Sequence, residues 1–334
     1  MDLNILWFIL IAVLFIGFFF LEGFDYGVGI LLPFLGKTDN ERRVLINSIG
    51  PVWDGNEVWL ITSGGAIFAA FPNWYATLFS GFYLALFVML AALIVRGVAF
   101  EFRSSDRSPA WRKLWDGLLF AGSLVSALLW GVAVTNLLQG VPIDGNMQYV
   151  GGFFDLLSPY TLVGGLVFVF LFVFHGALYL GLKTEGEMAT RAERAARFAG
   201  GLGLVFLLVL ALLTYTQTDL FNKAGAAIVL VLAAVAFVGA YLFARRRQIG
   251  WGFLFSGLTI LFLTVAVFWG LFPRVMVSSL NPAWNLTIYN ASSSPYTLKI
   301  MTIVALTLVP FVLAYQAWTY WVFRERVSVK KLHY

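Results

Sequence analysis

Long apolar runs recur along this chain, and they constrain its fold more than any other feature. A helix of about 20 apolar residues crosses the hydrocarbon core of a bilayer, which is about 30 Å thick. Only 12% of the residues are charged and 60% are hydrophobic, whereas a soluble domain is about 25% charged. The runs also lack the polar face that a helix in a soluble bundle needs. The sequence therefore predicts an all-α polytopic membrane protein rather than an apolar soluble bundle.

We expect nine spans in one integral membrane domain that covers residues 1–334, with no separate soluble domain. The second span contains Gly50 and Pro51, which could mark either its boundary or a kink. The first is longer than a bilayer requires, so it should tilt or project beyond the lipid. The nine spans are expected near 5–34, 48–71, 75–98, 115–138, 160–182, 198–216, 224–243, 251–272 and 300–323.

The basic residues fall on one side of this nine-span division. Most of the 22 Lys and Arg residues follow spans one, three, five and seven or lie in the C-terminal tail, and the other side keeps Lys223, Arg274 and Lys299. Lys and Arg concentrate in cytoplasmic loops, so the N-terminus is predicted outside and the C-terminus in the cytoplasm. The net charge of +5 then reflects topology and gives no reason to expect nucleic acid as a partner.

Four carboxylates lie within apolar segments of the first two spans. Glu22 and Asp25 are three residues apart, as are Asp54 and Glu57, and this spacing places two side chains on one helix face. With the predicted orientation, all four fall in the cytoplasmic half of one helix pair. A charged group at that depth costs about 2.5–3.5 kcal/mol by insertion scales. The pattern favours a cluster that conducts or buffers protons.

Two simpler interpretations compete with this one. Asp54 could cap a helix that begins at Pro51, with Glu57 beside it at the positive end of the helix dipole. That account leaves out Glu22 and Asp25. Arg96, at the inner end of the third span, could either neutralise one carboxylate or serve as a snorkelling anchor at the membrane surface.

Few residues of this chain could hold a metal or a haem. Cysteine is absent and there are two histidines. His333 is expected to be solvated in the tail. His175, in "FVFHGALYLG", could hold a haem from one side, but a lone membrane histidine more often forms hydrogen bonds or handles protons. Phosphate-loop, HExxH and dinucleotide motifs are also missing, so we expect neither a metal site nor a catalytic residue in this chain.

Several stretches then identify a family. The longest is "GFDYGVGILLPFLGKTDNERRVLINSIGPVWDGNEVWLITSGGAIFAAFP". "RGVAFEFR", "TNLLQGVP", "FPRVMVSSLNPAWNLTIYNASSSPYTLKIMT" and "YQAWTYW" extend the similarity along essentially the whole chain. Together they resemble subunit II of cytochrome bd, the bacterial quinol oxidase.

The resemblance implies a nine-helix fold of two four-helix bundles plus one peripheral helix, in the bacterial cytoplasmic membrane. It implies a heterodimer with a similarly folded subunit I, to which small single-helix subunits can be added. The complex would oxidise ubiquinol or menaquinol and reduce dioxygen to water. Haem b and haem d would be ligated chiefly by subunit I, and some relatives also hold a structural quinone in subunit II.

The resemblance also assigns Asp54, in the "WDGN" motif, to a proton route from the cytoplasm. Glu22 and Asp25 correspond to the acids of the family's "DGFD" motif. Glu57 stands where relatives have an uncharged amide, so its part in the route is inferred from its depth alone. We predict a non-haem subunit that completes the oxidase and supplies protons.

Two other classes of protein remain as alternatives. A proton-coupled secondary transporter would also need buried acids, but it should show paired broken helices from inverted repeats, and the sequence shows none. A purely structural assembly subunit would leave the carboxylates unexplained.

Overall fold

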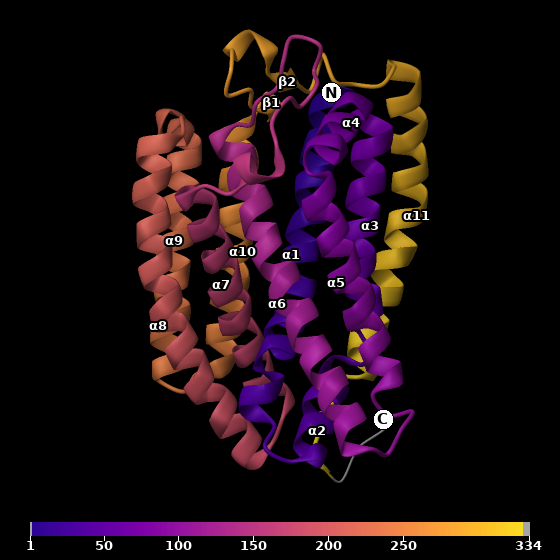
Figure 1. Cartoon of the computed structure of the whole chain (residues 1–334), viewed down its shortest axis with the longest axis vertical. Coiled ribbons are helices and arrows are strands. Elements are labelled where there is room, and N and C mark those ends of the chain that lie inside the picture. The colour runs from indigo at the N-terminus through magenta and orange to yellow at the C-terminus, as the bar shows by residue number, and fades with distance from the viewer. Residues whose placement is uncertain (1, 330–334) are drawn as a thin grey trace.

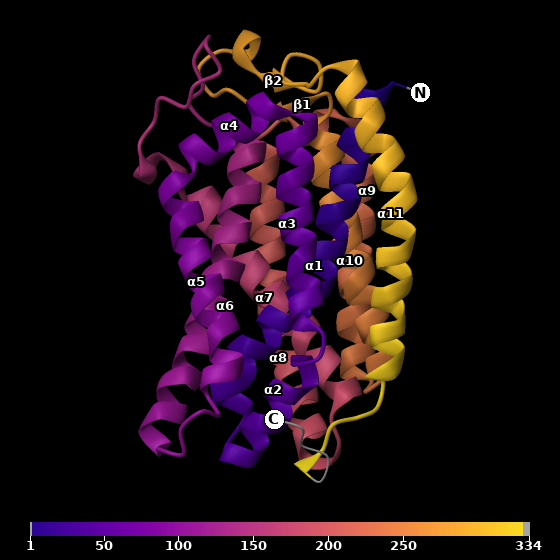
Figure 2. The same cartoon turned by 90° about the vertical axis from the view of Figure 1, so that its right-hand side faces the viewer.

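The computed structural model describes residues 2–329, so the predicted positions of Lys330, Lys331 and His333 lie outside the described residues. The chain is almost entirely helical, and its long helices run side by side along one axis (Figures 1 and 2). In chain order the elements are α1 (Leu3–Leu35), α2 (Asp39–Ile49), α3 (Trp53–Ala70), α4 (Pro72–Gly81), α5 (Tyr83–Phe102), α6 (Pro109–Gln139), η1 (Phe153–Leu156), α7 (Pro159–Lys183), α8 (Gly186–Gln217), η2 (Leu220–Asn222), α9 (Ala224–Arg245), α10 (Ile249–Leu271), β1 (Arg274–Met276), η3 (Pro282–Trp284), β2 (Leu286–Thr287) and α11 (Pro295–Val322).

Within residues 2–329, eight helices are long and apolar enough to cross a membrane. They are α1, α5, α6, α7, α8, α9, α10 and α11. The expected second span is not among them, because its counterpart α3 has 18 residues and carries Asp54 and Glu57 near its start. Helix α3 nevertheless runs parallel to its neighbours and packs against α1 (Figure 2). Length and composition therefore account for eight of the nine predicted spans.

Two boundaries differ from the sequence-based division. The region around Gly50 and Pro51 is a boundary, because a separate helix α2 ends at Ile49 and α3 begins at Trp53. The third span is divided into α4 and α5 at Phe82, which has φ −96° and ψ 16°. Just before this break, the ring of Tyr149 lies so near Gly81 that a Cβ there would be 2.7 Å from it. The loop between α6 and α7 therefore packs directly onto the break between α4 and α5.

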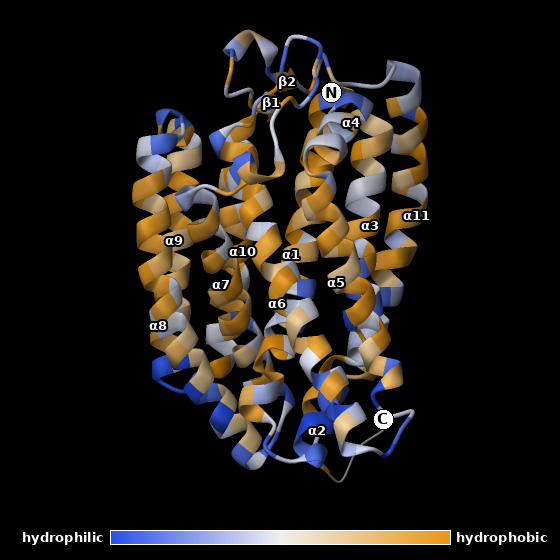
Figure 3. Cartoon of the chain, viewed as in Figure 1, coloured by the Kyte–Doolittle hydropathy of each residue, from blue (hydrophilic) through white to orange (hydrophobic). Residues whose placement is uncertain are grey.

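The molecule has a polar region at each end and an apolar band between them (Figure 3). At one end, β1 and β2 pair antiparallel within the connection between α10 and α11, and this end is called the strand end below. At the opposite end, called the α2 end, helix α2 begins with a capping box in which Thr38 and Glu41 bond each other's backbone N–H groups. Such a division of polarity is what a bilayer-spanning protein requires.

Helix α1 is the central helix of the structure and packs against α3, α6, α7 and α10. Its closest approach is to α7: a Cβ on Gly27 would overlap the carbonyl of Phe172 and lie 2.9 Å from the Cα of Gly176. Small residues at such positions let two helix backbones meet, which is the main source of helix association in lipid. This contact fixes where the side chains of α1 point one turn on either side.

Helix α11 is peripheral by comparison. It lies along α1 and α3, and Leu298 is its one buried residue among those described. Near the strand end the indole N–H of Trp7 donates to the carbonyl of Leu298 and to the hydroxyl of Thr302. Because so little apolar surface is buried, polar contacts of this kind hold α11 in place.

We predict that Gly27→Ala lowers the melting temperature of the purified protein, because overpacking a close helix contact typically costs about 1–3 kcal/mol. Gly117→Ala is the matched control, since Gly117 is helical and has nothing within 4 Å of the position of an added Cβ. Thermal unfolding followed by tryptophan fluorescence measures both variants. Equal melting temperatures for the two would contradict the packing argument.

Candidate proton-carrying site

Three carboxylates and one guanidinium meet where α1, α3 and α5 pack together. Glu22, Asp25 and Arg96 are all 0% exposed, and the side chain of Glu57 is 19% exposed. Arg96 Nη1 lies 2.5 Å from Glu22 Oε1 and 3.9 Å from Glu57 Oε2. The side chain of Arg96 therefore bridges the acids of α1 and α3 from a third helix.

Aromatic rings enclose the remaining faces of the guanidinium. Its central carbon lies 4.9 Å from the ring centre of Tyr26 and 5.7 Å from that of Phe100. On α6, Gly122 leaves room for the arginine, because a Cβ there would be 2.9 Å from Arg96 Cβ. A buried charge left without its partner is strongly destabilising. Arg96 can balance one carboxylate, so the net charge of the cluster depends on protons held by the others.

Asp25 is held by a hydrogen bond rather than by the arginine. Asn56 on α3 donates from Nδ2 to Asp25 Oδ2 over 2.7 Å. Asp25 Oδ1 has no hydrogen-bond partner among residues 2–329. The carboxyl group thus has one oxygen fixed by a neutral donor and one oxygen free to bind a proton.

Asp54 does not join this cluster. It lies in the first turn of α3 and is exposed on the surface of the chain. The sequence predicted four gathered carboxylates, but side chains at i and i+3 diverge by about 60° around a helix of 3.6 residues per turn. Glu57 consequently faces Arg96 while Asp54 faces outward. The four acids form a series from the surface to the interior, through Glu57.

Sequence reasoning overlooked three polar residues that belong to the site. Asn56 contacts Asp25, and Gln316 and Tyr320 of α11 contact Asn56. An amide within an apolar span needs a hydrogen-bond partner for each polar atom, because an unpaired one is costly. That requirement was the available signal for Asn56 and Gln316, although it does not say which partner each would find.

His175 is buried between α1, α7 and α10. Its Nδ1 lies 2.7 Å from Ser256 Oγ, its Nε2 lies 3.1 Å from the carbonyl oxygen of Phe20, and its ring stacks on Phe253 at 4.5 Å. Because a carbonyl can only accept, Nε2 carries a proton, while Nδ1 shares the hydroxyl of Ser256 with the carbonyl oxygen of Phe253, 2.8 Å from Oγ. Both nitrogens are occupied, which favours a role in joining three helices over ligation of a haem.

Ion pairs cover the cluster at the α2 end. Arg103, which follows α5, contacts Asp116 at 2.5 Å and Asp39 at 2.7 Å, while Arg42 and Arg112 each bind one of the same acids at 2.8 Å. Partial burial opposes ionisation of Asp39, but the hydrogen bond and charge of Arg103, with Arg112, lower its pKa below the usual value. Asp39 therefore stays charged at neutral pH, and the ion pairs of Asp39 and Asp116 tie the helix ends together.

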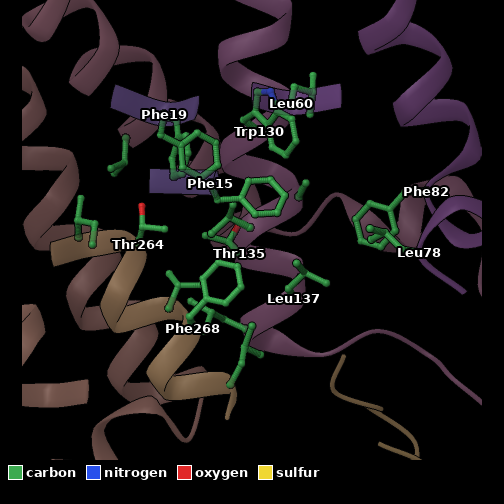
Figure 4. A pocket seen from close by; sticks show the side chains of 18 of the residues that line it. Phe15, Phe19, Leu60, Leu78, Phe82, Trp130, Thr135, Leu137, Thr264 and Phe268 are labelled. Atoms are coloured by element: carbon green, nitrogen blue, oxygen red, sulfur yellow. The ribbon is translucent and has the colours of Figure 1, made fainter. Parts of the chain in front are cut away.

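A separate cavity of about 770 Å³ lies among α1 and α3 to α10. Figure 4 shows that its walls are mainly aromatic and aliphatic side chains, among them Phe15, Trp130 and Phe268. None of the four carboxylates lines it. Trp74 and Trp130 both line it; within residues 2–329 the indole N–H of Trp74 has no hydrogen-bond partner, and that of Trp130 faces the hydroxyl of Tyr26. The cavity therefore suits a long apolar molecule with a hydrogen-bond acceptor.

Comparison with known proteins gives one consistent result. The family model described as cytochrome bd terminal oxidase subunit II matches residues 3–323. The chain is 48% identical to cytochrome bd ubiquinol oxidase subunit 2 of Bacillus subtilis, over 99% of this chain and 98% of that one. It is 41% identical to cytochrome bd-I ubiquinol oxidase subunit 2 of Escherichia coli K12, over 98% and 95% of the two chains. A chain of the bd oxidase structure from Geobacillus thermodenitrificans shares the fold, with a TM-score of 0.72 at 19% identity over 94% of this chain and 97% of that one.

We predict that Arg96→Met is more destabilising than the double variant Glu22→Gln/Arg96→Met. The single change leaves a buried carboxylate without its partner, which costs about 3–5 kcal/mol, whereas the double change removes both charges. Melting temperatures of the purified variants measure the difference. Identical values for the single and double variants would show that the two side chains are not energetically coupled.

Proposed function

Because this chain belongs to the cytochrome bd terminal oxidase subunit II family, we propose that it completes a bacterial quinol:dioxygen oxidoreductase and supplies protons for the reduction of dioxygen to water. It is a multi-pass membrane subunit of a terminal respiratory oxidase, and it acts together with a partner subunit. The family match over residues 3–323 carries this conclusion. The buried acids around Arg96 support the proton-carrying role.

We assign the haems of the complex, haem b and haem d, to the partner, subunit I. Haem needs axial ligands such as histidine, cysteine or methionine held in a suitable pocket. His175 is the one histidine among residues 2–329, and both of its nitrogens are already bonded. The residues of this chain thus fit a haem poorly, and the redox chemistry would take place in the partner of a heterodimer.

We further propose that the chain is a single integral domain of nine spans in the cytoplasmic membrane, with α3 as the ninth. Helix α3 lies along the same axis as its neighbours (Figure 2), and a partner subunit would cover its acidic side chains. The α2 end, which bears the predicted cytoplasmic loops, would face the cytoplasm, with the N-terminus outside. Helices α1, α3, α5 and α6 would form one bundle, α7 to α10 the second, and α11 the peripheral helix.

The route would begin at Asp54 on the surface and continue through Glu57 to Glu22 and Asp25. Asp54 is exposed on α3, close enough to Glu57 for their charges to interact, and Glu57 lies 3.9 Å from Arg96, the partner of Glu22. Each carboxylate can take up and release a proton, while Arg96 keeps a fixed positive charge among them. The acids of this chain would therefore hold protons near the partner's oxygen-reducing centre.

The exposed side of α3 supports docking of subunit I there. Asp54 facing lipid would be costly, and a partner would shield it. Gly55 is exposed beside Asp54 on the same helix, with nothing of this chain within 4 Å of an added Cβ. Small residues of this kind suit close contact with another helix. Single-helix accessory subunits could cover other exposed apolar helices.

We also propose that the cavity among α1 and α3 to α10 holds a structural quinone. The volume of about 770 Å³ and the apolar walls suit an isoprenoid chain. The N–H groups of Trp74 and Trp130, which line the cavity, could donate to a ring carbonyl. The cavity is not lined by the carboxylates, so this quinone would be a structural component.

A transporter and a purely structural subunit remain weaker accounts. The unbroken long helices α6 to α10 offer no paired interruptions of the kind that transporters use. A structural role alone gives no reason to bury Glu22, Asp25 and Arg96 together, because apolar residues would pack as well at lower cost.

We predict that Asp54→Asn leaves the haem spectrum of the purified complex nearly unchanged but lowers quinol oxidase turnover about 100-fold or more, because a positioned proton-transfer group typically contributes about 10²- to 10⁴-fold. Oxygen consumption with excess quinol measures turnover. Asp106→Asn is the control, since Asp106 is an exposed acid of the loop after α5. Full activity of Asp54→Asn would remove Asp54 from the route.

We predict that the double variant Trp74→Phe/Trp130→Phe lowers the quinone content of the purified complex several-fold, because it removes both donors and keeps the apolar walls. Extraction into organic solvent followed by chromatography measures quinone per haem. Trp251→Phe, on the exposed side of α10, should change nothing. A quinone content equal to that of the unaltered complex would show that these indoles do not hold the molecule.

A further inference from the structure

We propose that Gln316 and Tyr320 of α11 are positioning residues for Asp25: together they hold the amide of Asn56 with its N–H group facing the carboxylate. This inference deepens the proposed function, because it rests on Asp25 being part of the proton route. It assigns the peripheral helix a part in controlling a buried acid that α11 itself does not contact by any hydrogen bond among residues 2–329.

The direction of the hydrogen bonds follows from Trp59. An indole N–H can only donate, and Trp59 Nε1 donates to Gln316 Oε1 over 2.9 Å. The NH2 group of Gln316 is therefore the end that faces Asn56, where Nε2 lies 3.4 Å from Oδ1. Because the indole of Trp59 can only donate, it fixes the orientation of the Gln316 amide.

The same logic fixes the next amide. Asn56 Oδ1 accepts from Gln316 and also from the hydroxyl of Tyr320, over 2.7 Å. With its oxygen engaged by two donors, Asn56 presents Nδ2 to Asp25 Oδ2, also at 2.7 Å. The hydrogen bonds all run one way, from Trp59 through Gln316 and Asn56 to Asp25. A flipped Asn56 would place two NH2 groups against each other at Gln316 and its oxygen against the carboxylate of Asp25, while the hydroxyl of Tyr320 would have to accept instead of donate.

The position of Trp59 is itself restricted. A Cβ on Gly17 of α1 would overlap the ring of Trp59, so the indole packs directly on the α1 backbone. Trp59 and Asn56 are three residues apart on α3 and so lie on adjoining parts of one face. Helices α1 and α3 therefore fix the position of Trp59, and α11 completes the site with the side chains of Gln316 and Tyr320.

An N–H donor favours a carboxylate over a carboxylic acid, because it stabilises the charged form. Other groups act on Asp25 as well: Glu22 on α1, Glu57 on α3, Arg96 on α5, Tyr179 on α7 and Tyr320 on α11. Asn56 contributes a neutral donor whose direction α11 sets. When α11 is in place, Asp25 is held ready to accept the next proton.

The test uses the intact oxidase complex with Tyr320→Phe, Gln316→Met and the two changes combined. Each removes a donor to Asn56 and keeps most of the side-chain volume. We expect the acid limb of the pH–turnover profile to move to higher pH by about 0.5–1 unit, more in the double variant, because each change removes one hydrogen bond between neutral groups, which is worth roughly that shift. Turnover at alkaline pH and the haem spectrum should stay unchanged.

Trp7→Phe is the matched control. It removes the two hydrogen bonds from Trp7 on α1 to Leu298 and Thr302 on the same helix α11. These bonds are not part of the series that runs from Trp59 to Asp25. It should loosen α11, lower the melting temperature and leave the pH profile in place. A purely structural role for Tyr320 would instead make Tyr320→Phe behave like Trp7→Phe.

Asp25→Asn separates failure of this inference from failure of the proposed function. If Asp25→Asn turns over at the normal rate, Asp25 is not in the route and the proposed function loses that residue. If Asp25→Asn is impaired while Tyr320→Phe and Gln316→Met keep the pH profile of the unaltered complex, the positioning role is overturned and the route stands.

Discussion

The exclusion of unpaired charge from an apolar interior is the constraint on which this structure depends. Arg96 is fully buried in the helix bundle, and its guanidinium is compensated by Glu22 at 2.5 Å, by the faces of Tyr26 and Phe100, and more distantly by Glu57. A buried pair of this kind seldom adds stability over apolar residues of equal volume. Its presence within α1 and near the C-terminal end of α5 fits the proposed role, in which charged groups bind protons whose number sets the charge of the site.

Much of the fold could be predicted from the sequence, because a bilayer imposes a length and a polarity on every span. Apolar runs and basic loops predicted α1, α6, α7 and α9 to α11 closely, whereas α8 begins at Gly186, before the expected start near residue 198. The break at Phe82 could not be predicted, since it depends on Tyr149 packing against Gly81 from a distant loop. Helix α3 is a different case: a span was expected near 48–71, but α3 is not among the eight helices that qualify by length and composition, although it packs against α1.

The candidate site was predictable in its members more than in its arrangement. The cost of a charge at depth singles out Glu22, Asp25, Glu57 and Arg96 from sequence alone. The geometry is a different matter, because a spacing of three residues does not decide whether Asp54 faces inward with Glu57 or outward. Hydrogen-bond direction is less accessible still: only the contact of Trp59 with Gln316, which are 257 positions apart, determines how Asn56 faces Asp25.

The arrangement also suggests why the proposed proton route and the proposed docking surface share one helix. Helix α3 turns Asn56 toward Asp25 and Glu57 toward Arg96, while Asp54 and Gly55 are exposed. In a lone chain the exposed acid would face lipid, whereas against a partner it would be enclosed and still connected to the interior through Glu57. Assembly and proton access would then be one event, since contact with the partner would both shield Asp54 and bring the series of acids to the partner's surface. The close contact of Gly27 with α7 would keep α1 in place during such assembly. Glu22 and Asp25 would then keep their positions while α3 and α11 contact other elements.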